Sequence, residues 1–358
     1  MRPQTLRAGA SRSAAVPRGT SPPQRTAGRS SNNGAPPSPL AALRDKHIVV
    51  LPDLFVDVLA FLPSWKKTAP RLHAIARRGG GNLPVSAFEV KVGGNAANLA
   101  LALARLGAKV DLISETDPNG LRLLREAAHG TALGTRRVRV GNRASMTLGL
   151  ECPDANLMLS HAGPLADFGP ERLGATDWRL MKQADGVAFV NWAQNERGTD
   201  LLRRVASLHG PRGPFLYVDI GDPRNRLPAA RRLLKETRIW KRVGALGLNE
   251  NELGAFTGDP NDIGPADARE LARRLGTRLD LHTRRWAATV TLDSVVRVGA
   301  EASRPRRLTG AGDVWNAGNM AGHVLGWPAQ DRLRFAHRVA TKYVTSPDGV
   351  PPTAKEVE

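Results

Sequence analysis

The chain has 358 residues, a net charge of +19, 41% hydrophobic residues and a single cysteine, Cys152. This length suffices for one large α/β domain or two ordinary ones with a substantial core, and no stretch is long and apolar enough to predict a membrane span. The lone cysteine excludes an intramolecular disulfide and a cysteine-based zinc cluster, and it favours a reducing, cytoplasmic location.

Residues 1–44 carry seven arginines and no acidic residue. They are rich in serine, proline and glycine and lack hydrophobic periodicity, which is typical of a disordered basic N-terminal extension. Three interpretations compete: a misassigned start, an organelle transit peptide and a basic tail. The many prolines argue against the amphipathic helix of a mitochondrial signal, so organelle targeting is the less favoured of these.

The charge outside this extension, +19 less the seven arginines, is +12. It is spread over the chain in arginine pairs rather than gathered in one stripe, and aromatic residues make up only 5% of the chain. Single-stranded nucleic acid is usually bound by basic grooves with stacking aromatic side chains. We therefore interpret these arginines as solvated surface residues and consider a nucleic-acid partner unlikely.

An ordered domain is predicted over residues 45–350, with residues 351–358 as a tail. The apolar run after His47 predicts a buried strand, and residues 95–106 predict a helix ended by Gly107, followed by a strand at 109–114. Later strands are expected at 186–192, 215–220, 245–249, 279–283 and 287–292, with helices at 200–209 and 229–236 between some of them. This alternation predicts a mostly parallel sheet covered on both faces.

Residues 136–159 break the alternation of strands and helices. The segments RVRVGNRASMTLGLE and NLMLS are typical of hairpin strands. A small β element inserted in an α/β domain suggests a lid, to which we assign residues of about 62–92 and 136–160.

Three common catalytic motifs are absent from the sequence: the P-loop, H-E-x-x-H and G-x-S-x-G. The dinucleotide motif G-x-G-x-x-G fails as well, because Trp315 stands at its third glycine position. What remains is T-G-A-G-D before a predicted helix. The glycines of such a loop let backbone N–H groups converge on an anion at a helix N-terminus, and Asp313 would hold a hydroxyl group beside it. The alternative is a tight turn with Asp313 as a helix cap.

Two further polar clusters precede predicted helices. The stretch VGGNAAN at residues 92–98 combines two glycines with Asn95 and Asn98, whose amides suit a neutral polyol; N-capping by Asn95 is the alternative. Asn249 and Glu252 are three residues apart at the end of a predicted strand, a spacing suited to Mg²⁺-bound water and phosphate. A favourable helix dipole explains an acidic residue there equally well.

Together and in this order, these features resemble the PfkB/ribokinase carbohydrate kinase family. VGGNAANLALALARLGAKV is similar to its first signature and LTGAGDVWNAGNMAGHVLG to its second, and the resemblance covers roughly residues 47–350. It implies a ribokinase-like three-layer αβα sandwich with a small β lid. The implied activity is transfer of the γ-phosphate of ATP, with Mg²⁺, to a hydroxymethyl group of a sugar, sugar phosphate or nucleoside.

The resemblance also implies a role for each matching residue. The catalytic base would be Asp313, and the anion hole would be formed by Gly310, Ala311 and Gly312. Asn249 and Glu252 would bind the metal and the phosphates, Glu252 through water. The substrate would contact Asp57, Gly93, Gly94 and Asn98.

One departure from the family pattern concerns a cation. The family usually has an aspartate before the anion hole, where this chain has Arg307. If that aspartate helps to bind a monovalent cation, Arg307 removes the ligand and adds a competing charge, so we expect no activation by K⁺. The first lid segment is also longer and more basic than in plain sugar kinases, which would suit a phosphorylated substrate or simply a charged surface.

Three questions stay open at this point. A nucleoside kinase is the nearest rival function, and Trp65, Phe88 and Met146 would supply its apolar wall unless they belong to the core. A non-catalytic protein that binds a sugar or a polyanion is the rival from another class. Pairing of lid sheets would give a homodimer.

Overall fold

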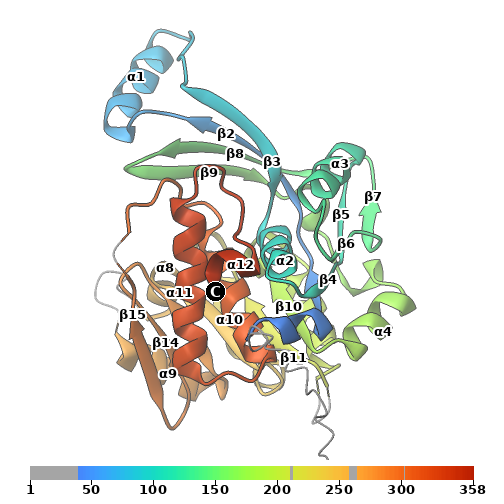
Figure 1. Ribbon diagram of the computed structural model, residues 1–358. Coiled ribbons are helices and arrows are strands. Elements are labelled where there is room, and N and C mark those ends of the chain that lie inside the picture. Colours follow the sequence, from blue (N-terminus) through green and yellow to red (C-terminus); the bar gives the residue numbers. More distant parts are fainter. Residues whose placement is uncertain (1–38, 210–212, 258–263, 302) are drawn as a thin grey trace, which may run out of the picture. The chain divides into compact units, whose positions relative to one another are not determined.

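The main sheet dominates the computed structural model, which describes residues 39–209, 213–257, 264–301 and 303–358 (Figure 1). Its nine strands lie in the order β15-β14-β13-β12-β11-β10-β1-β4-β6. The strands from β13 to β6 pair in parallel, and β14 and β15 are antiparallel at one edge. The strands are β1 (His47–Leu51), β4 (Lys109–Leu112), β6 (Leu133–Gly134), β10 (Gly186–Val190), β11 (Phe215–Asp219), β12 (Ala245–Asn249), β13 (Leu279–His282), β14 (Trp286–Val290) and β15 (Val295–Gly299).

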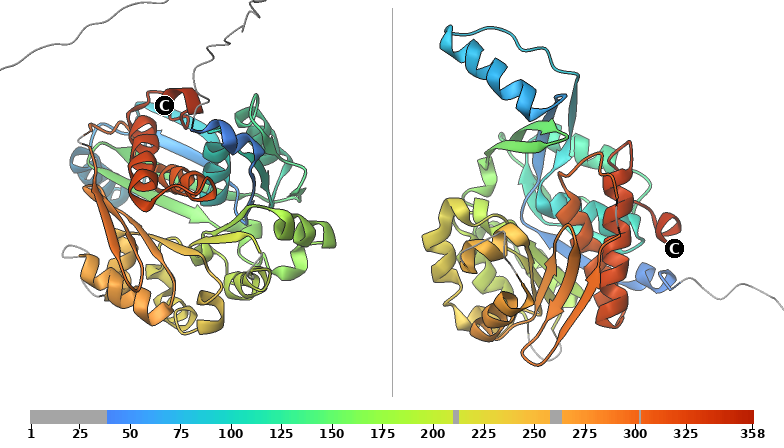
Figure 2. Two further views of the ribbon diagram at one scale, coloured as in Figure 1. Left: turned by 60° about the horizontal axis from the view of Figure 1, so that its bottom comes forward. Right: turned by 90° about the vertical axis from the view of Figure 1, so that its left-hand side faces the viewer.

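The central strands are apolar runs because both faces of the sheet are covered. All five residues of β10 are buried, as are four of the five in β1. Helices form a layer on each side of the sheet, as the left view of Figure 2 shows. One hydrophobic core contains residues of α4 (Ala175–Gln183), α5 (Gly198–Ala206), α6 (Leu227–Leu233), α7 (Thr237–Trp240), α8 (Glu250–Thr257) and α9 (Pro265–Leu275); the other contains residues of α2 (Asn95–Arg105), α3 (Pro118–Ala127), α10 (Ala311–Val324) and α11 (Ala329–Thr345).

Close packing of α10 against α11 fixes the position of the site described below. A Cβ on Gly318 would lie 2.8 Å from the Cα of Ala336, and one on Gly322 would lie 2.9 Å from Cγ of Arg332. Such distances leave no room for a side chain, so small residues are required on this face of α10. The N-terminus of α10 is thereby held at the carboxyl ends of the sheet strands.

A second sheet of four strands, in the order β3-β2-β8-β9, forms the lid. Two of its strands, β8 (Ser145–Cys152) and β9 (Ala155–His161), are the hairpin expected from the sequence. A third strand, β3 (Ala87–Gly93), overlaps the end of the other predicted lid segment. The fourth strand, β2 (Phe55–Phe61), precedes both predicted ranges. A helix, α1 (Trp65–Arg77), stands between β2 and β3 and projects with the lid in the right view of Figure 2.

One part of the predicted hairpin lies elsewhere. Residues 138–140 form β7 (Val138–Val140), which pairs in parallel with β5 (Ser114–Thr116) rather than with the lid. The expected strand at 109–114 is accordingly divided between β4 and β5. Period-two alternation identifies a strand but does not identify its pairing partner, so the expectation that residues 138–140 belong to the lid is wrong.

Both predicted ends of the ordered domain need correction. Before residue 45, Ala41–Asp45 forms a 3₁₀ helix with Leu43 fully buried in the core. After residue 350, α12 (Ala354–Val357) packs against α11, Val357 is 1% exposed, and Arg338 Nη1 donates to its carbonyl at 2.8 Å. The predicted disorder of residues 1–38 lies outside the described residues.

Within the described ranges, no helix combines the length and apolarity that crossing a membrane requires. The cytoplasmic location expected from the sequence stays a prediction.

Candidate active site

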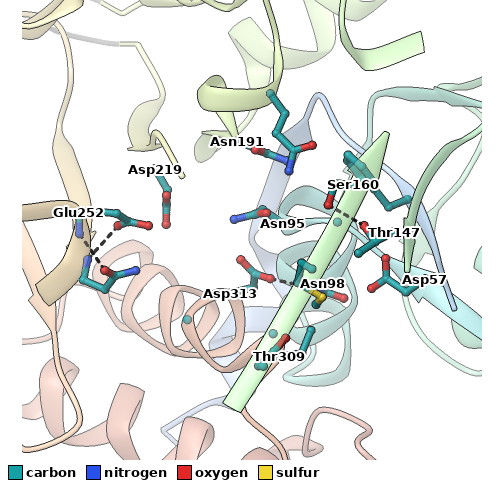
Figure 3. A pocket seen from close by; sticks show the side chains of 18 of the residues that line it. Asp57, Asn95, Asn98, Thr147, Ser160, Asn191, Asp219, Glu252, Thr309 and Asp313 are labelled. Carbon is teal, nitrogen blue, oxygen red and sulfur yellow. Dashed lines mark hydrogen bonds between the residues drawn. The ribbon is translucent and has the colours of Figure 1, made fainter. Parts of the chain in front are cut away.

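A cavity of about 310 Å³ lies between the lid and the carboxyl ends of the sheet strands. In Figure 3, Asp57, Thr147 and Ser160 of the lid stand at one end and Asp219 and Glu252 at the other, with Asp313 between them. Its described lining consists of Phe55, Asp57, Gly94, Asn95, Asn98, Thr147, Asn156, Met158, Ser160, Asn191, Gln194, Asp219, Asn249, Glu252, His282, Thr309, Gly310, Gly312 and Asp313.

Most of the predicted site residues are therefore together. Asp57, Gly94, Asn98, Asn249 and Glu252 line the cavity with Gly310, Gly312 and Asp313. Gly93 and Ala311 are not part of the lining, although each is next in sequence to a residue that is.

The loop before α10 has the geometry of an anion site. Gly310 is the N-cap residue, with φ +81°, and its position carries no side-chain capping bond. The N–H of Ala311 donates to the carbonyl of Leu308 at 3.2 Å, but the other first backbone N–H groups of a helix without such a cap are available to an anion. A Cβ on Gly310 would lie 2.8 Å from Oη of Tyr343, which itself donates to the carbonyl of Thr309 at 2.8 Å. Glycine is thus required here by both conformation and space.

Asp313 faces the cavity from the first turn of α10. Its Oδ2 accepts a hydrogen bond from Nδ2 of Asn98 at 2.9 Å, in place of the bond to a backbone N–H that a capping role would need. Burial raises the pKa of Asp313 well above its ordinary value, the bond from Asn98 opposes this rise, and the charge of Asp219 adds to it. A carboxylate with a raised pKa is a better proton acceptor.

Asp57 stands on the inner face of the lid. It lies opposite Lys91 of β3 and Thr147 of β8 in the register of the sheet. A Cβ on Gly93 would lie 1.9 Å from Oδ2 of Asp57, so the absence of a side chain at Gly93 makes room for this carboxylate. Burial raises the pKa of Asp57 to about 6, an effect that Lys91 only partly offsets.

The N-terminus of α2 is capped from a distant segment rather than by Asn95. The backbone N–H of Ala96 donates to Oδ1 of Asp53 at 2.9 Å, and Nδ2 of Asn191 donates to Oδ2 of Asp53 at 3.0 Å. Burial raises the pKa of Asp53 to about 6. Because Asp53 serves as the cap, the side chain of Asn95 is available to line the cavity.

At the opposite end, Asn249 and Glu252 form a reciprocal cap on α8. Oδ1 of Asn249 accepts from the N–H of Glu252 at 3.0 Å, and Oε2 of Glu252 accepts from the N–H of Asn249 at 2.9 Å. Burial and the charge of Asp219 raise the pKa of Glu252 well above its ordinary value. The pair therefore caps a helix and also places a carboxylate in the cavity.

These oxygen atoms suit Mg²⁺, which prefers carboxylates and nucleotide phosphates and keeps several waters. The carboxylates of Asp219 and Glu252 are both buried, and their negative charges repel each other. A divalent cation would relieve this repulsion. Within the described ranges, no three histidine, cysteine or acidic side chains are arranged to hold a metal alone. The donors fit an ion that is bound partly through the nucleotide and through water.

Several lining residues were not predicted. Asn191 follows β10, Asp219 is the last residue of β11, and His282 ends β13 directly opposite Asn249. The rule that ligands bind at the carboxyl ends of parallel strands could have found these three. The sequence could not predict Ser160, because the direction of its side chain toward the cavity depends on how β9 pairs with β8.

Arg307, which stands where the family usually has an aspartate, lies just before the loop of residues 309–312, here called the anion loop. Its Nη2 donates to the carbonyl of Pro347 at 3.1 Å, and its Nη1 is 3.9 Å from a carboxylate oxygen of Glu89. The side chain is only 10% exposed, and a Cβ on Gly349 would overlap the guanidinium. This charge is thus a fixed part of the fold.

The comparisons with known proteins agree with this geometry. The profile of the pfkB family carbohydrate kinases matches residues 67–355, whereas a search of curated proteins by sequence gave no match. Among solved structures, ribokinase of Arabidopsis thaliana in complex with ribose and ATP superposes with a TM-score of 0.69 at 19% identity, over 87% of this chain and 97% of that one. Adenosine kinase of Sinorhizobium meliloti gives 0.68 at 17% identity, over 84% and 94% of the two chains.

The likeness to these structures confirms the expected ribokinase-like α/β fold, with its large, mostly parallel sheet and separate small β sheet. The match of the family profile covers most of the chain. The chain belongs to the PfkB family of carbohydrate kinases, ATP-using enzymes that transfer a phosphoryl group to an alcohol acceptor.

Proposed function

We propose that the enzyme phosphorylates a hydroxymethyl group of a neutral sugar or related polyol, with ATP as donor. The observation that carries this proposal is the composition of the cavity. Six amide side chains and three hydroxyl groups line it, and none of its described lining residues is a lysine or arginine. Amides and hydroxyls both donate to and accept from sugar hydroxyls, whereas a phosphorylated sugar would leave its charge without a partner.

Two of the side chains expected to form the apolar wall of a nucleoside site do not face the cavity. Phe88 and Met146 are 66% and 46% exposed. In the register of the lid they share a face with Val90 and Leu148, opposite to the face of Asp57 and Thr147. The expectation that these side chains form either such a wall or the core is therefore wrong for both residues.

The proposed reaction is a displacement by the acceptor hydroxyl on the terminal phosphorus of ATP. Asp313 holds this hydroxyl and accepts its proton late in the step, while Asn98 keeps the carboxylate in position. The backbone N–H groups of Gly310 and Gly312 stabilise the charge on the transferred group, since the N–H of Ala311 already donates to the carbonyl of Leu308. Asp57 accepts hydrogen bonds from hydroxyls at the far end of the acceptor.

In this proposal, Glu252 and Asn249, joined by Asp219, hold Mg²⁺ through water. The ion supplies charge neutralisation to the nucleotide phosphates when it is bound. The residues themselves keep that end of the cavity polar and aligned with the anion loop.

A phosphorylation assay over four substrate groups tests the proposal: neutral sugars, cyclic and linear polyols, sugar phosphates and nucleosides. We expect the highest kcat/KM within the first two groups. A preference for a sugar phosphate or a nucleoside would overturn the assignment of the substrate.

The binding of the acceptor should weaken as the pH falls below about 6, which is the pKa of Asp57. Above this pH the carboxylate is ionised and accepts hydrogen bonds; below it, protonation removes one acceptor atom. Where only the ionised form binds, Kd rises about tenfold per pH unit. Calorimetry from pH 5 to 8 measures this. The pKa of Asp53 is also about 6, so Asp53 is the alternative source of such a pH dependence. If Asp57→Asn kept the native pH dependence, its assignment to Asp57 would be wrong.

The rate should be the same in K⁺ and Na⁺ at matched ionic strength. The fixed guanidinium of Arg307 already binds the carbonyl of Pro347, an oxygen of the kind that K⁺ would need, and it repels a second cation. Steady-state assays in the two chlorides check this expectation. Stimulation by K⁺ would show that a cation binds despite Arg307.

We further propose that the outer face of the lid pairs with the same face of a second copy of the chain. Five of its side chains are 41–66% exposed: Phe88, Val90, Met146, Leu148 and Leu159. A contiguous apolar face of this kind commonly marks an interface. Light scattering should give the mass of a dimer for the native chain and of a monomer for Leu148→Lys. A native monomer at high concentration would disprove the pairing.

A further inference from the structure

The lid touches the anion loop through two polar side chains of its hairpin. Glu151 of β8 and Asn156 of β9 face each other across the hairpin, and Nδ2 of Asn156 donates to Oε1 of Glu151 at 3.3 Å. Both side chains also hydrogen-bond the hydroxyl of Thr309. Glu151 is only 8% exposed, so a buried carboxylate of the lid is committed to a residue of the main domain.

Thr309 is the residue that leads into the anion site. Its carbonyl accepts the hydrogen bond of Tyr343, a side chain that is 4% exposed, and Gly310 follows with no free space for a side chain. The loop is therefore held on one side by α11 and on the other by the lid. A shift of Thr309 toward or away from the lid must move the first backbone N–H groups of the anion site.

A second contact joins the same two parts. Arg307 lies 3.9 Å from Glu89 of β3, an ion pair on the inner side of the lid. Two strands of the lid sheet, β3 and β8, thus supply carboxylates to the segment 307–309. The geometry at Arg307 is looser than at Thr309, so Glu151 provides the stronger of the two links.

The same hairpin carries the side chains that face the acceptor. Thr147 of β8 and Met158 and Ser160 of β9 line the cavity, as does Asn156 itself. An acceptor that binds these residues therefore favours one position of the hairpin. Glu151 is a few residues from Thr147 on the same strand, so it moves with the hairpin. Because Glu151 bonds the hydroxyl of Thr309, the position of the hairpin affects the position of Thr309.

We propose that Glu151 is a positioning residue that couples the acceptor to the nucleotide: acceptor binding on the hairpin sets the anion loop through the Glu151–Thr309 bond. This inference rests on the proposed reaction but not on the identity of its acceptor. Coupling of this kind is reciprocal, and it is measured as the factor by which one ligand changes the affinity of the other.

The test is the Kd of AMP-PNP with Mg²⁺, measured by calorimetry without acceptor and with a saturating amount of the panel compound that has the highest kcat/KM. In the native enzyme we expect the acceptor to tighten AMP-PNP binding about fivefold or more. Thr309→Val and Glu151→Gln should reduce this factor to less than about twofold, and the double variant should lose no more than either alone, because the two residues share one interaction.

Two controls separate coupling from folding. Thr309→Ser keeps the hydroxyl and should keep the coupling. Asp154→Asn alters another carboxylate of the same hairpin, one that accepts from Oγ of Ser64 and the N–H groups of Trp65 and Lys66 rather than from the loop, and it should leave the factor unchanged.

Retention of the native factor in Thr309→Val, or its loss in Asp154→Asn, would overturn the inference. The inference would also be overturned if the native enzyme bound AMP-PNP with the same Kd in the presence and absence of the acceptor. The proposed function fails separately, if the best panel compound is a nucleoside or a sugar phosphate.

Discussion

Asp313→Asn should abolish most of the phosphoryl transfer while it leaves acceptor binding within a few-fold of native. The amide keeps the size of the side chain and can still accept the hydrogen bond that Asn98 donates, but it cannot take the proton of the hydroxyl. Loss of a positioned general base lowers rates by about 10²- to 10⁴-fold. Release of ADP in a coupled assay measures kcat, and calorimetry measures acceptor affinity.

The matched control is Asp331→Asn. Asp331 is also an acidic residue in the first turn of a helix, α11, but it is exposed and lies outside the cavity lining. Its replacement should leave kcat unchanged. If Asp313→Asn kept a rate within a few-fold of native, the carboxylate would not be the base and the mechanism would be wrong.

Gly310→Ala should have the second-largest effect. The residue has φ +81°, and a Cβ would lie 2.8 Å from the hydroxyl of Tyr343, so the loop must move and its N–H groups must leave their positions. Loss of a single such donor lowers kcat by about 10²- to 10³-fold in comparable sites. We expect kcat with ATP to fall by at least this factor.

Gly326→Ala separates this displacement from backbone strain alone. Gly326 has φ +74° just beyond the other end of α10, and no atom lies within 4 Å of its added Cβ. Both variants incur a backbone cost of roughly 1–2 kcal/mol, which thermal unfolding measures, but only Gly310→Ala should lose activity. Equal losses of activity would mean that strain in α10, and not the anion loop, is responsible.

The sequence by itself determined the features that depend on nearby residues. The apolar runs predicted most strands of the main sheet, because strands buried on both faces need apolar side chains at every position. The glycine pairs around residues 94 and 310 marked the two loops of the cavity, because backbone conformations with positive φ favour glycine. The identity of Asp313 followed from its place next to such a loop.

Only the tertiary structure decided features that join distant segments. Asp53 caps a helix that begins some forty residues later, and Glu151 bonds Thr309 from 158 positions away. Alternation in β8 shows that Met146 and Thr147 point in opposite directions, but it does not show which of them faces the cavity, because that depends on where the main domain lies beneath the lid. Strand pairing and domain packing fix those directions, and they also place the polar side chains of the lid over the anion loop.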